Sequence, residues 1–421
     1  MKHKYRLCTI QKALGLWSVA FVFLLFLTSC LSEKRGSEEL GFVIKAKNAS
    51  GVTQDNVIVE LKKGDIPSGE TGVDFSSLVV FRGEEEIPSQ YNDEKMLFIV
   101  EELNPGAEAH YFLKKGTANS YPKRSQAELS IKTGGHFENR TYIGGEFENI
   151  KYLRVPDEHT DHSYFIRYEG PGWESDLVGY RFYLDWRNAT DAFGKKTHDM
   201  VLQQVGLDGF DSYHEMQDWG MDVLKVGSSL GIGSMGMYSD NRAIRVDKTD
   251  SVTCEVLENG AIQSAIETNY YGWKVGEGTF DIQSILSIHA GTRLTHHEIQ
   301  ISGKPDNLCT GIGKDGKAKL YTDQGNEHQL GYLATYGLQS LNNDELGLAV
   351  FFASKDYQGF TEDEYSHIVK LNVEGGDVDY YFLAAWDGEI DGITGEDAFI
   401  TYIQETAKKL AGPLEITTTK N

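Results

Sequence analysis

Residues 279–288 read TFDIQSILSI, and this stretch decides the fold class of the chain. Phe280, Ile282, Leu286 and Ile288 alternate with positions that are mostly polar. Because successive side chains of a strand point to opposite faces, this period of two predicts a half-buried antiparallel strand. A strand of this length, with similar segments before and after it, predicts a large sandwich of two antiparallel sheets.

Similar segments recur along the chain between glycine-containing turns. In region 121–421 the predicted strands are 163–168, 180–184, 252–257, 261–270, 279–288, 294–301, 346–352, 367–373 and 378–384. Shorter strands at 42–45, 57–61, 77–81, 96–100 and 109–113 predict a small N-terminal β-sandwich. We therefore expect a mainly β protein with an N-terminal β-domain at 41–120 and a larger β-domain at 121–421.

Helices play a small part in the predicted fold. The segment 396–410 has apolar residues on one helical face and ends before Gly412-Pro413, so it predicts a short C-terminal helix. We also expect a shorter helix over 192–204.

The N-terminus predicts export and lipid anchoring. A basic leader without acidic residues precedes an apolar run from Leu14 to Leu27, and Leu27-Thr28-Ser29-Cys30 follows. This order is typical of a secretory signal, which we place at residues 1–29. A cysteine directly after the cut resembles a lipobox, so Cys30 is the predicted lipidation site, followed by a tether over 30–40. We expect an exported lipoprotein anchored to the outer membrane, on its periplasmic or cell-surface face.

Charge and cysteine content exclude several classes of function. Without the four basic residues of the signal, 36 basic residues face 63 acidic ones, a formal net charge of −27. Such a surface repels polyanions, so we expect no nucleic-acid partner. Cys254 and Cys309 remain after Cys8 and Cys30 are assigned to the signal and the anchor, and either a disulfide or two buried thiols fits them. Their spacing fits no zinc site, and we expect no metal and no cofactor.

Residues 172–228 concentrate the side chains that suit chemistry. Bases are gathered there in an otherwise acidic chain, together with half of the six tryptophans: Arg181, Arg187, Lys195, Lys196, Trp173, Trp186 and Trp219. Arginine pairs with a carboxylate or sulfate through two parallel hydrogen bonds, so this set predicts a pocket for an anionic sugar. We assign substrate binding to Arg181, Arg187, Lys195, Trp173, Trp219 and Asp222. The alternative is a set of surface ion pairs with Asp185, Asp191 and Asp199.

Strand alternation sorts the residues of 180–185. Arg181, Tyr183 and Asp185 share one face, which is polar and suits a cleft, whereas Tyr180, Phe182 and Leu184 share the other. The second face is expected in the core.

Histidines and their neighbours provide the candidate acids and bases. His198 and His214 lie inside the same stretch, and imidazole titrates near neutral pH. We assign catalysis to His214, His198, Tyr213 and Lys225, while a structural role remains open for each histidine. His159-x-x-His162 has a spacing that chelates, but no acidic helix frames it.

The motifs of this stretch resemble an uncharacterised lipoprotein family of polysaccharide-utilisation gene clusters. The motifs are Trp-Glu-Ser-Asp at 173–176, Tyr-Arg-Phe-Tyr-Leu-Asp at 180–185, Asp-Ala-Phe-Gly-Lys-Lys at 191–196, and Trp-Gly-Met-Asp-Val-Leu-Lys-Val-Gly at 219–227. This family is similar to the ulvan oligosaccharide dehydratases. The resemblance implies a β-supersandwich of the galactose-mutarotase type and an activity that removes water from a terminal uronic acid.

That reaction needs three kinds of group. Arg181, Arg187 or Lys195 would neutralise the uronate carboxylate, and His198 or His214 would take the C5 proton. Tyr213, Lys225 or the other histidine would protonate the departing hydroxyl. Two alternatives stay open: a glycoside hydrolase using Asp185, Asp218 or Asp222, and a non-catalytic glycan-binding protein using Trp173, Trp186 and Trp219.

Overall fold

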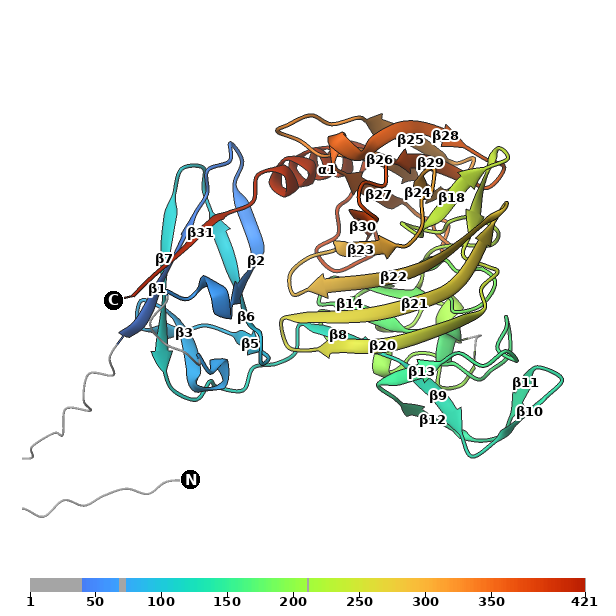
Figure 1. Ribbon diagram of the computed structural model, residues 1–421, viewed down its shortest axis with the longest axis horizontal. Coiled ribbons are helices and arrows are strands. Elements are labelled where there is room, and N and C mark those ends of the chain that lie inside the picture. The colour runs from blue at the N-terminus through green and yellow to red at the C-terminus, as the bar shows by residue number, and fades with distance from the viewer. Residues whose placement is uncertain (1–39, 68–72, 210–211, 421) are drawn as a thin grey trace, which may run out of the picture. The chain divides into compact units, whose positions relative to one another are not determined.

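The computed structural model describes residues 40–67, 73–209 and 212–420 (Figure 1). The predicted signal, Cys8 and the predicted lipidation site Cys30 lie outside these residues. Within them, no helix has the length and apolarity needed to cross a bilayer.

Two small sheets form the N-terminal part. Their antiparallel orders are β31-β1-β7-β3-β4 and β2-β6-β5. The strands are β1 (Leu40–Lys47), β2 (Gln54–Lys62), β3 (Leu78–Arg82), β4 (Glu85–Glu86), β5 (Ser89–Tyr91), β6 (Lys95–Leu103), β7 (Glu108–Lys115) and β31 (Glu415–Lys420). They enclose an apolar core of their own that includes Ile44, Phe98 and Leu113. The C-terminal strand β31 pairs with β1, so both ends of the described chain meet in one sheet.

A nine-stranded antiparallel sheet is the largest element of the fold. Its order is β13-β20-β21-β22-β23-β30-β27-β26-β25. The strands are β13 (Tyr152–Arg154), β20 (Ser251–Asn259), β21 (Gln263–Val275), β22 (Gly278–His289), β23 (Thr295–Ile301), β25 (Ala318–Asp323), β26 (Gly331–Gly337), β27 (Leu346–Phe352) and β30 (Asp377–Trp386). In β22, Phe280, Ile282, Leu286 and Ile288 are buried as the alternation predicts. The mainly β fold predicted from the sequence is confirmed.

Two five-stranded sheets accompany it, with the orders β17-β16-β15-β14-β8 and β19-β18-β24-β29-β28. The first contains β8 (Ser125–Glu128), β14 (Gly172–Ser175), β15 (Val178–Phe182), β16 (Thr190–Lys195) and β17 (Gly220–Asp222); the second contains β18 (Gly236–Ser239), β19 (Arg242–Arg245), β24 (Leu308–Gly313), β28 (Tyr357–Glu362) and β29 (Ser366–Leu371). Short hairpins add β9 (Ser130–Thr133), β10 (His136–Glu138), β11 (Thr141–Ile143) and β12 (Glu146–Asn149).

The β15 sheet packs with its inner face on the nine-stranded sheet. Trp173 donates a hydrogen bond from Nε1 to Thr295 Oγ1 at 2.9 Å. The Tyr180 hydroxyl donates to the carbonyl of Arg293 at 2.7 Å and accepts from the Ala384 amide at 2.9 Å. These bonds satisfy polar atoms inside a shared apolar core, which fixes how the two sheets face each other.

The predicted C-terminal helix is confirmed as α1 (Glu396–Ala411). Its buried face contains Phe399, Ile403 and Ala407, which pack on side chains of β26 and β27. The 3-10 helices are η1 (Lys63–Asp65), η2 (Phe75–Ser77), η3 (Arg167–Glu169), η4 (Leu202–Gln204), η5 (Ser212–His214) and η6 (Ser354–Asp356).

Two predicted elements are wrong. The expected helix over 192–204 begins instead inside β16, which pairs with β15 on one side and β17 on the other. Pairing on both edges overrides the local helical pattern. The expected strand over 163–168 is a loop that leads into η3. Tyr164 and Tyr168 have φ angles of 57° and 37°, in the left-handed region, which no extended strand contains.

Both described cysteines are free and buried. Cys254 lies on β20 and Cys309 on β24, in different sheets. Of the two alternatives for these residues, the structure contains the pair of buried thiols.

Candidate functional site

The outer face of the β15 sheet carries a row of buried polar side chains. Alternation along β15 and β16 turns Arg181 and Asp191 outward, while Tyr180, Phe182 and Ala192 enter the core between the sheets. The predicted division into a polar face and a core face is present for residues 180–182, whereas β15 ends at Phe182 and both Tyr183 and Leu184 belong to the core cluster. Arg181 is only 2% exposed, so other parts of the chain, including Tyr213 of η5, cover this polar face.

Arg181 is the centre of five interacting residues, which we call the Arg181 cluster: Arg181, Tyr183, Asp191, Tyr213 and Asp222. Its Nη2 lies 2.6 Å from Asp191 Oδ2 and 2.7 Å from Asp222 Oδ2, and its Nη1 donates to the Tyr213 hydroxyl at 2.8 Å. The Tyr183 hydroxyl donates to Asp191 Oδ2 at 2.7 Å. Each of these hydrogen bonds from the Arg181 guanidinium goes to a buried side chain.

One guanidinium therefore faces two buried carboxyl groups. Burial raises the pKa of Asp222 well above its usual range, and the neighbouring Asp191 raises it further, while Arg181 lowers it. Arg181 can neutralise one negative charge in this interior, so a proton on the second carboxyl avoids an uncompensated charge. Burial and the neighbouring Asp191 therefore both favour a proton on Asp222, against the opposing effect of Arg181.

His214 connects this cluster to solvent. It ends η5, its side chain is 43% exposed, and its Nε2 lies 3.4 Å from Asp222 Oδ2. Its ring lies on that of Tyr213, with centroids 4.5 Å apart. A proton held by Asp222 is therefore one contact away from an imidazole that reaches the surface.

Arg187 organises a second group, the Arg187 cluster: Asp161, Glu169, Asp185 and Arg187. Its guanidinium pairs with Asp185, with Glu169 at 2.8 Å and with Asp161 at 3.1 Å. Arg187 is 12% exposed at its side chain, so this guanidinium reaches solvent more than that of Arg181.

Tyr183 and Glu169 join the two clusters. The Tyr183 ring lies 3.7 Å from the guanidinium carbon of Arg187 and 4.7 Å from that of Arg181, measured to the ring centroid. Burial raises the pKa of Glu169, whereas Arg187 and Arg181 both lower it. The two clusters form one continuous polar region, and the exposed rings of Tyr164 and Trp186 come from the same loops.

Several predicted site residues have structural surroundings. Trp173 is fully buried between the sheets. Lys195 is also fully buried, and its Nζ lies 2.7 Å from Glu174 Oε2 and from the carbonyl of Ser175. Both side chains are out of reach of a dissolved ligand, so we do not carry them into the proposed site.

Two further predicted residues lie on the surface away from the Arg181 cluster. His198 is half-exposed and bonds to the carbonyl of Asp176 at 2.9 Å and to Asp391 at 3.3 Å. Lys225 is exposed and forms no hydrogen bond or ion pair with the residues that the structure describes. Trp219 is partly buried and packs on Phe193, which also contacts Tyr213. The structure thus brings together Arg181, Tyr213, His214 and Asp222.

Residues 46–416 match the model of a protein family described as a domain of unknown function, DUF4861. The chain belongs to this family. No curated protein matches it.

Similar solved structures include two larger chains. An alpha-mannosidase from Enterococcus faecalis V583 has a TM-score of 0.49 and 10% sequence identity, and a glycosyl hydrolase family 38 protein from Enterococcus faecalis has a TM-score of 0.46 and 11% identity. Each match covers 90% of this chain but only 46% and 47% of the other chains, so the DUF4861 chain spans less than half their length. Neither similarity assigns an activity to it.

Three residues of this polar region of the DUF4861 protein were not predicted from the sequence as site residues. Asp191 was considered only as a surface ion-pair partner, and Asp161 and Glu169 were not considered. Alternation of side chains along β16 could have identified Asp191, because it places this residue on the same face as Arg181. The loop that contains Glu169 gave no periodic signal, because His162, Tyr164, Tyr168 and Glu169 all have positive φ angles. Left-handed residues of this kind cluster at functional sites.

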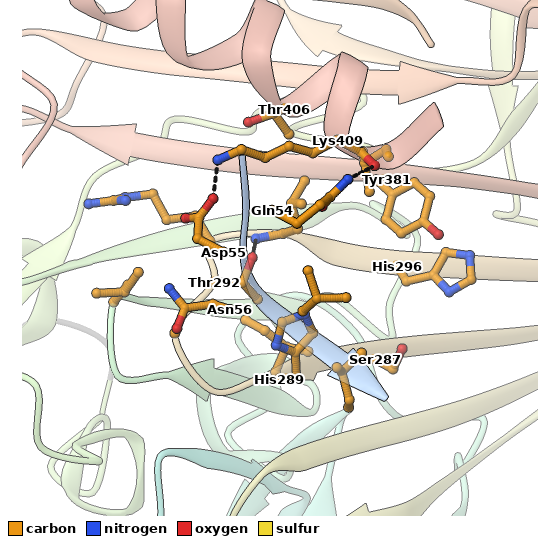
Figure 2. Close-up of a pocket in the computed structure, with 18 of the residues that line it drawn as sticks. Gln54, Asp55, Asn56, Ser287, His289, Thr292, His296, Tyr381, Thr406 and Lys409 are labelled. Atoms are coloured by element: carbon orange, nitrogen blue, oxygen red, sulfur yellow. Dashed lines mark hydrogen bonds and ion pairs between the residues drawn. The ribbon is translucent and has the colours of Figure 1, made fainter. Parts of the chain in front are cut away.

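A separate cavity of about 410 Å³ is lined by residues of β2, β22, β23 and α1. Figure 2 shows the lining residues Gln54, Ser287, His296 and Lys409 among others. Its walls are tied together: Lys409 forms an ion pair with Asp55, and Gln54 Nε2 donates to the carbonyls of Lys409 and Gly412 at 3.1 and 2.7 Å. His296 stacks on Tyr381 at its rim, with ring centroids 4.3 Å apart. None of the residues predicted to form the site lines this cavity.

Proposed function

We propose that this protein is a carbohydrate-active enzyme, a dehydratase. It removes water from the saturated uronic acid at the non-reducing end of ulvan-type oligosaccharides and leaves a 4,5-unsaturated uronate. The observation that supports this proposal is the contact between half-exposed His214 and buried Asp222, which shares one guanidinium with Asp191. Burial favours a proton on Asp222, and the contact connects that carboxyl group to a side chain that a substrate can touch.

The elimination requires no oxidant or reductant. His214 takes the proton from C5, the electron pair of that bond forms the C4–C5 double bond, and the C4 hydroxyl leaves. The same proton, returned by His214 to the departing oxygen, completes the water molecule when the hydrogen and the hydroxyl lie on one face of the sugar. Tyr213 is almost fully buried, and its pKa is raised to about 12 by burial, so its role is to position His214 and Arg181.

Arg187 is the better of the two arginines for the substrate carboxylate. Its side chain is 12% exposed against 2% for Arg181, and one of its partners, Asp161, is itself 34% exposed, whereas the partners of Arg181 are all buried. A uronate carboxylate paired with a guanidinium makes the C5 proton more acidic, and the carbanion-like charge that develops is stabilised. Trp186, 46% exposed, and Tyr164, 37% exposed, offer flat apolar surfaces for neighbouring sugar rings.

The two alternatives have less support. A hydrolase needs two carboxyl groups presented to substrate. Of the three aspartates considered for this role, only Asp218 is exposed, because the Asp185 side chain is fully buried on Arg187 and the Asp222 side chain is only 2% exposed. A glycan-binding platform of three tryptophans is not formed, because Trp173 is fully buried and Trp219 is partly buried.

Mass spectrometry of oligosaccharide products tests the proposal directly. We expect saturated uronate–rhamnose-sulfate oligosaccharides incubated with the purified protein to lose the mass of one water while the chain length stays the same. Shortened chains would instead indicate a hydrolase. An unchanged spectrum, with binding measured in parallel, would favour the glycan-binding alternative.

We also propose that the protein is an exported lipoprotein, attached to the outer membrane through Cys30. The support is the sequence of the leader alone, since these residues lie outside the described structure. Metabolic labelling with a palmitate analogue should mark the wild-type protein and leave Cys30→Ser unlabelled. Equal labelling of both proteins would contradict the anchor at this position.

A further inference from the structure

The loop before β14 brings three metal-binding side chains to one place. The ligand atoms of Asp161, His162 and Glu169 all lie within 4.8 Å of one another. Histidine and carboxylate ligands stand roughly 2.0–2.2 Å from a transition-metal ion, so ligands on opposite sides of one ion are separated by about twice that distance. His162 Nδ1 lies 2.8 Å from Asp161 Oδ1, and Arg187 contacts Asp161 at 3.1 Å and Glu169 at 2.8 Å, so a cation bound by all three side chains would replace part of these contacts. We propose that Asp161, His162 and Glu169 bind one divalent cation of the manganese or zinc type.

The charge of the surrounding region favours a cation. In the Arg187 cluster, Arg187 faces Asp161, Glu169 and Asp185, whose side chains are 34%, 5% and 0% exposed. Three carboxylates against one guanidinium leave two negative charges in excess. Uncompensated charge is costly away from water, and a divalent ion supplies the two positive charges that are missing.

His159 is an independent indication of a ligand. The residue is 6% exposed, and its Nδ1 is hydrogen-bonded to Ser163 Oγ at 2.8 Å. Its buried Nε2 has no hydrogen-bond partner among the described residues. The charged groups that act on this ring are Asp185, Arg187 and Arg140, and the main-chain carbonyl of Glu169 also interacts with it. A buried imidazole nitrogen that makes no well-formed hydrogen bond, and adjoins the main chain of Glu169 and the charges of the Arg187 cluster, suits the shell around a metal ion.

The site is open to an incoming ion. The side chain of His162 is 62% exposed and that of Asp161 is 34% exposed, so two of the three ligands reach solvent. One imidazole with two carboxylates suits manganese or zinc better than calcium, which prefers oxygen ligands alone. The sequence alone led us to expect no metal, because the cysteine and histidine spacings fit no zinc site and no acidic helix frames His159-x-x-His162.

The cation also supplies what an anionic substrate requires. The two clusters contain five carboxyl groups and two guanidinium groups, an environment that repels a uronate. A divalent ion beside Arg187 would cancel the two excess negative charges of the Arg187 cluster and give the uronate carboxylate a second partner. This role in catalysis rests on the proposed function, whereas the cation site itself does not.

Binding of Mn²⁺ to the chelator-stripped full chain tests the site without any sugar. Calorimetric titration, with electron paramagnetic resonance of free Mn²⁺, should give one ion per chain. Asp161→Asn and His162→Asn should weaken binding by more than the roughly 10–100-fold that loss of an outer-shell partner costs. Asparagine is chosen at position 162 because it tolerates the φ angle of 57° there.

The Glu327–His328 pair provides matched controls. It is an exposed carboxylate–imidazole pair separated by 3.3 Å, with side chains 84% and 85% exposed. Glu327→Gln and His328→Asn should bind Mn²⁺ as the wild type does. Absence of saturable binding in the wild type, or equal binding in the Asp161→Asn and His162→Asn variants, would overturn the site.

Turnover assays separate the two proposals. If the protein binds Mn²⁺ at this site but never removes water from the sugar, the cation site is supported and the proposed function is contradicted. If the protein removes water at full rate in excess chelator and binds no Mn²⁺, the proposed function is supported and the cation site is contradicted.

Discussion

Replacement of Arg181 by methionine should lower the free energy of unfolding by about 3–5 kcal/mol, the usual cost of removing one partner from a buried ion pair. The guanidinium is 2% exposed and holds Asp191 and Asp222 at 2.6 and 2.7 Å. Methionine has a similar length but no charge, so both carboxyl groups would lose their counter-ion. Urea unfolding followed by circular dichroism measures the difference.

Two comparisons separate charge from packing in this prediction. Arg82→Met replaces an exposed arginine, and we expect it to change the free energy of unfolding by less than about 0.5 kcal/mol. The second comparison uses pH. Because burial raises the pKa of Asp222, the folded protein binds this proton more tightly than the unfolded chain does, so its contribution to stability falls as pH rises toward the raised pKa.

Arg181→Met removes the guanidinium that lowers the pKa of Asp222. The loss in free energy of unfolding relative to the wild type should therefore increase with pH. We expect a smaller loss at about pH 5, where the carboxyl groups take up protons more readily, than at about pH 8. The groups that face Asp222 are Asp191, Arg181, His214 and the Leu224 amide. An equal loss at both pH values would show that the cost arises from packing alone.

Alternation along single strands made the fold class predictable. The periodicity of β22 and the helical face of α1 are local properties of the sequence, and both elements were predicted close to their observed bounds. The segment 192–204 was predicted wrongly because β16 is held by pairing with β15 and β17, and β17 lies more than 20 residues further along the chain. Local patterns do not contain that information.

The site was predictable only in part for a related reason. Composition drew attention to 172–228, and within this stretch Arg181, Tyr213, His214 and Asp222 come together in the structure. Whether a charged residue is buried depends on the loops that cover it, so the sequence did not separate buried Lys195 from exposed Lys225. Glu169 lies in a loop several of whose residues have positive φ angles, and such a loop has no periodic sequence pattern from which its position could be predicted.

Replacement of His214 by glutamine should reduce dehydration by about 10²–10⁴-fold, the usual contribution of one positioned proton-transfer group. The side chain is 43% exposed, so its loss creates no buried cavity and the fold should remain intact. The rate of appearance of the unsaturated uronate, measured by its ultraviolet absorbance, gives the effect. Turnover like that of the wild type would eliminate His214 as the base.

A double variant tests whether Asp222 acts through His214. Asp222 is 2% exposed, so it cannot touch the sugar directly, and its expected role is to hold the imidazole and share its proton. Asp222→Asn alone should therefore slow turnover, yet it should add little to His214→Gln, since residues that act as a unit are not additive. His328→Gln, at an exposed histidine in another loop, should leave turnover unchanged. If the two losses at Asp222 and His214 multiplied instead, Asp222 would contribute to catalysis by a route that does not pass through His214.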